Sequence, residues 1–160
     1  MQKMTIYKIS LIFFSAWFWT TALVDFVAVP TVFRTIESLT EAGRVGIKIF
    51  SLYNLLEIFF ASILVFCAIK LRAQKWGKSI VAWCALLLIQ VLFYKFFITK
   101  EIASAATQMQ TLDALSPEFA KLVDARAFYH QLYVNLDKFK LSSLLFLIIK
   151  FLRIRSEELV

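Results

Sequence analysis

Glycine, proline, cysteine and histidine are scarce in this sequence of 160 residues, which holds 3, 2, 2 and 1 of them respectively. The chain has no glycine-rich phosphate loop, no HExxH motif and no Ser-His-Asp spacing. The single histidine, His130, excludes a haem with two histidine ligands from one chain and leaves a metal site without its usual imidazole partners. Cys67 and Cys84 form no CxxC pair, so we expect buried thiols. We therefore expect no enzyme, no metal and no cofactor.

Apolar residues are abundant instead. They make up 61% of the sequence, 17 of them are phenylalanines, and the mean hydropathy is +0.75. Soluble domains are only about 45–50% apolar. A soluble domain of this length could not hide so much apolar surface in one core. The composition therefore predicts an integral membrane protein whose main partner is the lipid bilayer.

Four apolar runs predict four membrane-spanning helices within a single domain, residues 1–160. The predicted spans are residues 6–29, 47–69, 79–98 and 133–152. The first run is longer than the core of a signal peptide and lacks a small-residue cleavage site, so we interpret it as an uncleaved span. Pro30 should end it. The fourth run reaches the required length only if Asp137, Lys138 and Lys140 lie near one end of the span.

The connection between the third and fourth spans, residues 101–126, is polar and rich in alanine. We expect it to be an additional amphipathic helical segment, broken near Ser116 and Pro117, where proline suits the first turn of a helix. A second helix start is expected near Ser38. The predicted fold class is thus all-α: an integral membrane four-helix bundle with this extra helical segment.

The distribution of lysine and arginine predicts the orientation. The N-terminus, the second connection and the C-terminus carry nine basic residues, and the turn from Lys70 to Lys78 contains no acid. The first and third connections carry six basic residues mixed with six acidic ones. Both termini should therefore face the cytoplasm. A net charge of +7 without any nucleic-acid-binding motif points to lipid headgroups rather than nucleic acid.

Several polar residues fall inside the predicted spans, where a charge costs roughly 2.5–3.5 kcal/mol on insertion scales. Glu57 lies near the centre of the second span and shares a helix face with Asn54. We predict an intramembrane cluster, neutralised in part by Lys95 or Lys138, made of Asp25, Asn54, Glu57, Lys95, His130 and Asp137. Two interpretations are open: a proton or cation relay or small ligand pocket, and interhelical contacts that hold the helices in register. We favour the second.

Short motifs resemble a known family. Three segments are similar to the sequences at helix ends and helix starts in the DUF4149-type four-helix membrane family, which includes transmembrane protein 205 and its bacterial relatives. They are residues 29–34 (VPTVFR), residues 41–46 (EAGRVG) and Phe128-Tyr129-His130. The resemblance implies a four-helix membrane fold and a bacterial inner-membrane location, but no agreed activity. It attaches importance to Pro30, Phe33, Gly43 and His130. The chain departs from the family pattern in lacking a proline near the end of the third span.

Two functions are consistent with these observations. The first is a non-enzymatic membrane protein, a small partner or scaffold subunit that contacts another membrane protein or a second copy of itself. The alternative is a small oligomeric transporter or channel element that uses the intramembrane acidic and histidine cluster, since four spans alone rarely enclose a pathway.

Overall fold

The structure is a computed structural model, and it describes residues 2–154. Its described residues form helices and no strands, which confirms the all-α class. In chain order the elements are α1 (Gln2–Leu23), the π-helical turn η1 (Val24–Ala28), α2 (Val29–Thr35), α3 (Leu39–Leu71), α4 (Gly77–Phe93), the π-helical turn η2 (Tyr94–Ile98), α5 (Thr99–Gln108) and α6 (Pro117–Leu152).

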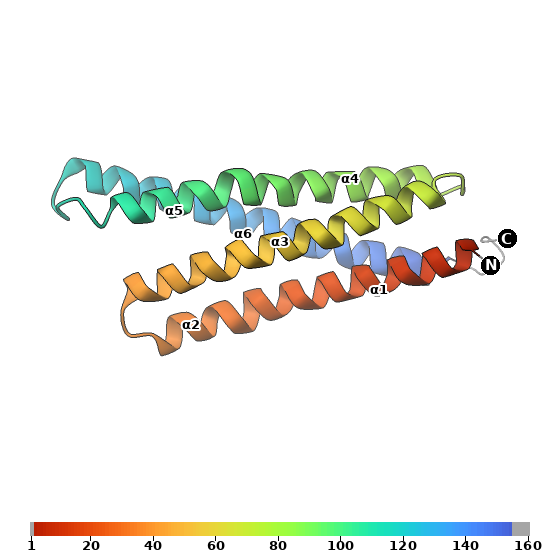
Figure 1. Ribbon diagram of the computed structural model, residues 1–160, viewed down its shortest axis with the longest axis horizontal. Coiled ribbons are helices and arrows are strands. Elements are labelled where there is room, and N and C mark those ends of the chain that lie inside the picture. The colour runs from red at the N-terminus through yellow and green to blue at the C-terminus, as the bar shows by residue number, and fades with distance from the viewer. Residues whose placement is uncertain (1, 155–160) are drawn as a thin grey trace.

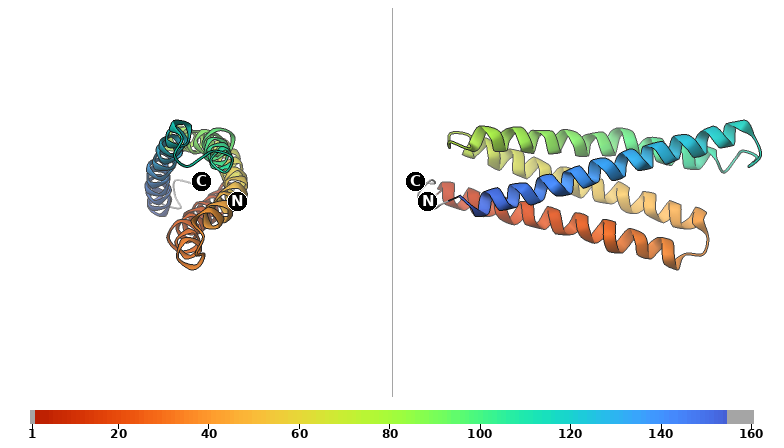
Figure 2. Two further views of the ribbon diagram at one scale, coloured as in Figure 1. Left: turned by 90° about the vertical axis from the view of Figure 1, so that its left-hand side faces the viewer. Right: turned by 180° about the vertical axis from the view of Figure 1, so that it is seen from behind.

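These elements make four long rods that lie side by side (Figure 1). The first rod is α1–η1–α2, the second is α3, the third is α4–η2–α5 and the fourth is α6. The rod of α3 packs against α1 and α4, and α6 packs against α1 and α5, so the rods surround a common interior (Figure 2). Both ends of the described chain lie beside the α3–α4 turn, and the other two connections lie at the opposite end.

The first rod continues through Pro30 instead of ending there, so the prediction of a helix end at this proline is wrong. The π-helical turn η1 immediately precedes the proline, and the N–H of Val29 donates to the carbonyl of Val24. Proline breaks helices because it lacks an N–H and crowds the carbonyl four residues back. The widened turn, with Pro30 in the first turn of α2, lets the helix run on to Thr35.

The third rod is also longer than predicted. We expected the third span to end at residue 98 and a separate amphipathic segment to follow from residue 101, but η2 carries the helix without interruption into α5, which ends at Gln108. No proline or glycine is present there to end it. The two predicted helix starts are confirmed: Ser38 accepts from the N–H of Glu41 and Ser116 from that of Phe119.

Three helical stretches are long and apolar enough to cross a membrane: Lys3–Thr35, Thr40–Leu71 and Gly77–Gln108. Their outward faces carry many large apolar side chains, among them Trp19 and Phe26, about 70% exposed. The fourth predicted span, within α6, does not reach the same apolarity because α6 contains Asp137, Lys138 and Lys140. Arg155, one of the nine basic residues counted above, lies outside the described residues.

Candidate functional site

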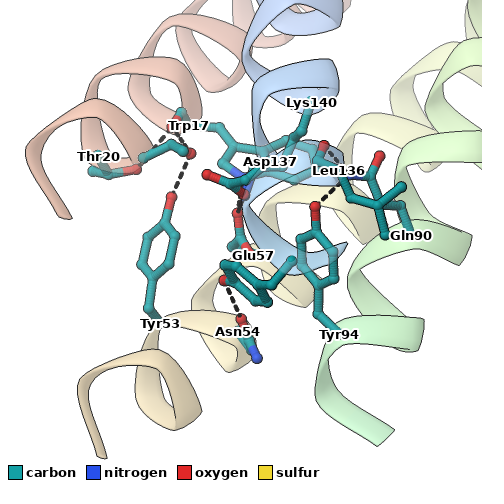
Figure 3. Close-up of polar contacts among 12 residues, drawn as sticks. Trp17, Thr20, Tyr53, Asn54, Glu57, Gln90, Tyr94, Leu136, Asp137 and Lys140 are labelled. Carbon is teal, nitrogen blue, oxygen red and sulfur yellow. Dashed lines mark hydrogen bonds and ion pairs between the residues drawn. The ribbon is translucent and has the colours of Figure 1, made fainter. Parts of the chain in front are cut away.

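A buried ion cluster lies in the interior between α1, α3 and α6 (Figure 3). The ammonium group of Lys140 on α6 lies 2.5 Å from Oε1 of Glu57 on α3, and it also contacts the carboxylate of Asp137, one turn earlier on α6. Lys140 and Glu57 are completely buried, and Asp137 is 5% exposed. Buried charges of this kind are tolerated only when they are paired, so each partner stabilises the charge of the other.

Glu57 also joins the cluster to the first rod. The indole Nε1 of Trp17 donates a hydrogen bond of 2.9 Å to the same Oε1 atom that Lys140 contacts. The other carboxylate oxygen, Oε2, is buried and has no hydrogen-bond partner among the described residues. Glu57 is therefore the residue that links three rods at one height.

Asp25, in the π-helical turn η1, brings a third carboxyl group to the cluster. Its carboxyl group lies close enough to those of Asp137 and Glu57, and to the ammonium group of Lys140, to interact with them electrostatically. Three carboxyl groups thus face one lysine. If all three were ionised, the cluster would carry net negative charge in an interior that offers little solvation.

Neutral polar side chains flank the ion cluster on two sides. Towards the α2–α3 end, the hydroxyl of Tyr133 donates to Oδ1 of Asn54, whose Nδ2 donates to Thr99. The hydroxyl groups of Thr21 and Tyr53 are 2.5 Å apart. On the α4 side, Nε2 of Gln90 donates both to the hydroxyl of Tyr94 and to the carbonyl of Leu136. These bonds connect all four rods.

The rings of Tyr53 and Tyr94 also hold the buried lysine in place. The ammonium group of Lys140 lies 5.7 Å from the ring centroid of Tyr53 and 5.2 Å from that of Tyr94. At this separation the negative face of an aromatic ring attracts a cation. The lysine is thus enclosed by carboxylates and aromatic rings rather than by apolar side chains alone.

The structure brings together four of the six residues predicted for the cluster: Asp25, Asn54, Glu57 and Asp137. Lys95 instead donates to the hydroxyl and the carbonyl of Ser51. Lys138 is exposed, and so is His130, which lies on the wall of a separate cavity. Lys140 therefore takes the role that we expected of Lys95 or Lys138.

Lys140, Trp17 and Tyr94 also belong to the cluster, although none of them was predicted as a member. For Lys140 a signal was present, because Tyr133, Asp137 and Lys140 are spaced four and three apart and so share one helix face. No such signal was present for Trp17, because an indole in an apolar run can face lipid as readily as it can donate a hydrogen bond to another helix. Within residues 2–154, no three His, Cys, Asp or Glu side chains are placed to hold a metal ion.

A separate cavity of about 350 Å³ lies between α2, α3, α5 and α6, towards the end of the molecule opposite the termini. Its wall is mostly apolar and includes Phe33, Ile47, Phe50 and Ile102. Three of the positions singled out by the sequence motifs, Phe33, Gly43 and His130, line it. A smaller cavity of about 180 Å³ adjoins it and shares Gly43, Ile47, Met109 and Arg126.

Fold and site together define an all-α protein with three helical stretches able to cross a membrane and a charged, buried interior. Residues 12–111, more than half of the chain, match the family described as a domain of unknown function (DUF4149), and the chain belongs to that family. Neither the curated proteins nor the solved structures include a significant match to it.

Proposed function

We propose that this protein is a non-enzymatic integral membrane protein, a small scaffold or partner subunit that crosses the membrane four times. The three apolar helical stretches support insertion, and α6 would be the fourth span. Its two central charges, Asp137 and Lys140, point into the interior and neutralise each other, so they are not presented to lipid. A hydropathy scale counts them as if they were exposed, which together with the exposed Lys138 explains why α6 falls short by composition.

The orientation and location are part of the same proposal. Lysine and arginine accumulate at the end that holds both termini and the α3–α4 turn, which supports a cytoplasmic position for that end. The family resemblance of the first, second and fourth helices suggests a bacterial inner membrane. The narrower resemblance to transmembrane protein 205 stays a prediction from those short motifs.

The observation that carries the scaffold function is the network around Glu57. Its hydrogen bonds and ion pairs run between rods, from Trp17 on α1 to Glu57 on α3 and Lys140 on α6. Polar contacts of this kind fix the relative height and rotation of helices in a membrane. The network thus favours a rigid bundle that offers its apolar outer surface to another membrane protein or to a second copy.

The experiment is purification of the tagged chain from native membranes in mild detergent, followed by determination of mass and composition. We expect a complex of fixed stoichiometry, either with a second copy or with another integral membrane protein. The Glu57→Gln variant should lose both the complex and the stable bundle, whereas Lys138→Gln, which changes an exposed residue on α6, should retain both. A monomeric, partner-free protein would contradict the proposal.

A small oligomeric transporter or channel element is the second candidate, favoured by the excess of carboxyl groups around Lys140. An acidic cluster with unpaired oxygens at the depth of the membrane centre is a feature of proton pathways. In proteoliposomes with an imposed pH gradient, this candidate predicts proton flux that Glu57→Gln abolishes. The scaffold proposal predicts no flux above that of empty liposomes.

A further inference from the structure

The cavity between α2, α3, α5 and α6 has a mostly apolar wall, to which Thr99, His130 and Tyr133 also contribute, and among the described residues Arg126 is the one lysine or arginine that lines it. We propose that this cavity binds one long-chain fatty-acid anion, with the acyl chain among the apolar side chains and the carboxylate on the guanidinium of Arg126. The inference rests on the proposed insertion of the protein into a membrane and adds a ligand that the scaffold function does not require.

Arg126 is partly buried and lacks a counter-charge. It makes no hydrogen bond and no ion pair with any described residue, unlike the buried Lys140. A guanidinium group provides up to five donors in a planar fork that matches the geometry of a carboxylate. A partly buried arginine without a partner therefore lies ready to bind an anionic group.

Gly43 makes room for this guanidinium. A Cβ atom placed on Gly43 would lie 3.1 Å from Nη2 of Arg126, closer than ordinary contact. An alanine at position 43 would require the guanidinium to move by a few tenths of an ångström, and a larger side chain would require more room. The absence of a side chain on α3 thus allows the charge on α6 to face the cavity.

The position of the cavity along the helix axis places its charged end at the depth of the lipid headgroups. Gly43 precedes Glu57 by 14 residues, and Arg126 precedes Lys140 by the same number. At about 1.5 Å per residue, Arg126 therefore lies roughly 21 Å from the ion cluster along the helix axis. With the ion cluster at the membrane centre, this exceeds the half-thickness of the hydrocarbon region, about 15 Å, and reaches the headgroups.

The inner end of the cavity lies within the hydrocarbon region. Phe50 and Tyr133 are each seven residues from the ion cluster and seven from the Gly43–Arg126 level, which places them roughly 10 Å from the centre. The cavity thus runs from charge at headgroup depth to aromatic rings at acyl-chain depth. Its volume of about 350 Å³ lies at the lower end of the roughly 300–1,000 Å³ range of small-molecule sites, which suits one chain better than two.

The test is equilibrium dialysis of radiolabelled myristate against the purified full-length protein in maltoside detergent. We expect saturable binding, and Arg126→Gln should weaken it about tenfold because one charge-assisted hydrogen-bonded contact is lost. Myristyl alcohol, which has the same chain without the charge, should bind the wild-type protein and Arg126→Gln equally. Ala127→Phe, at an exposed position on the cavity wall, should weaken the binding of both ligands.

Arg34→Gln is the matched control, because Arg34 is an exposed cation at the same end of the molecule and does not line the cavity. It should bind myristate as the wild type does. The inference is overturned if binding is not saturable, if Arg126→Gln and the wild type bind myristate equally, or if phosphatidylglycerol displaces myristate as effectively as unlabelled myristate does. Carbonate extraction of membranes tests insertion separately, so a failure of the membrane proposal would be recognised as such.

Discussion

The ammonium group of Lys140 and Oε1 of Glu57 lie 2.5 Å apart although 83 positions separate the two residues in the chain. Both side chains are completely buried, and their helices, α3 and α6, run in the same direction. The ion pair therefore holds two non-consecutive rods at one relative height. Removal of Lys140 would leave the buried carboxylates of Glu57 and Asp137 without their cation, whereas removal of Glu57 would leave Lys140 paired with Asp137.

This asymmetry predicts the outcome of a double-mutant cycle. Glu57→Gln and Lys140→Met should each destabilise the protein by about 3–5 kcal/mol, because the first removes the carboxylate that both Lys140 and Trp17 contact and the second leaves Glu57 and Asp137 without a cation. The double variant should lose less than the sum of the two single changes. Thermal unfolding in detergent measures the three values. Lys138→Gln, on the exposed side of α6, serves as the control and should change stability by less than about 0.5 kcal/mol. Additive effects of the two changes would refute a direct coupling.

Asp25→Asn should act in the opposite direction. The change keeps the size of the side chain, removes one of three carboxyl groups that face one lysine, and supplies an amide donor for Asp137. We expect the variant to be about 1 kcal/mol more stable than the wild type at neutral pH. Thermal unfolding under the conditions of the cycle above gives the comparison. A loss of stability as large as that of Glu57→Gln would show that the carboxyl group of Asp25 is required.

Trp17→Phe tests the link between the first rod and the cluster. The change deletes the N–H that donates to Glu57, a bond to a charged acceptor worth about 1.5–3 kcal/mol. Trp19→Phe provides a matched control, because Trp19 is 69% exposed and faces away from the interior. Unfolding measurements should separate the two variants by at least the value of that bond, and equal losses would contradict the assigned role of the indole.

Gly77→Ala should disrupt the turn between α3 and α4. A Cβ atom at this position would overlap the carbonyl oxygen of Leu71 and lie 2.7 Å from the Cα of Arg72, and both are backbone atoms that cannot move aside as a side chain can. We expect a loss of several kcal/mol, measured as a lower unfolding temperature. Gly46→Ala is the control, since its Cβ would lie at an ordinary 3.5 Å from the ring of Phe33. Equal behaviour of the two variants would contradict this steric role.

Cysteine labelling tests the proposed topology. Cys67 and Cys84 are buried, so both can be replaced by alanine to give a background without accessible thiols. In that background Leu115→Cys, at a tip between α5 and α6 that is 92% exposed, should react with an impermeant maleimide on intact cells. Ala73→Cys, in the α3–α4 turn, should react only after the membrane is opened. Labelling of both positions from outside would exclude the proposed crossing by α4–α5.

Much of the fold was accessible from local signals in the sequence. Apolar runs predicted the helical rods, and Ser38 and Ser116 marked two helix starts because a serine before a helix satisfies a free backbone N–H. The failures are also local: Pro30 and Lys100 look like helix ends, and both are passed by helices that contain a π-helical turn. The hydrogen bond of a π-helical turn, between residues five apart, has no characteristic residue pattern from which the turn could be predicted.

The site was predictable only in part. A carboxylate inside a membrane requires polar or charged partners, because an unpaired charge there is costly. The convergence of Asp25, Glu57 and Asp137 could therefore be predicted. The choice of cation did not, because Lys95, Lys138 and Lys140 are equally basic and differ only in the direction in which each side chain points. The rotation of α6 decides between Lys138 and Lys140, and it depends on packing against α1 and the α4–α5 rod rather than on any neighbouring residue.

The two π-helical turns, η1 and η2, determine what the deletion of a single residue would do to the rods that contain them. Each turn holds one residue more than an α-helical turn at the same place would, so deletion of a single residue there would restore regular winding. The part of the rod beyond the deletion would then rotate by roughly 100°. In the first rod this rotation would move Phe33 off the cavity wall while leaving Trp17 on Glu57. Loss of one residue at positions 26–28, beyond Asp25, would thus alter one end of the molecule independently of its centre.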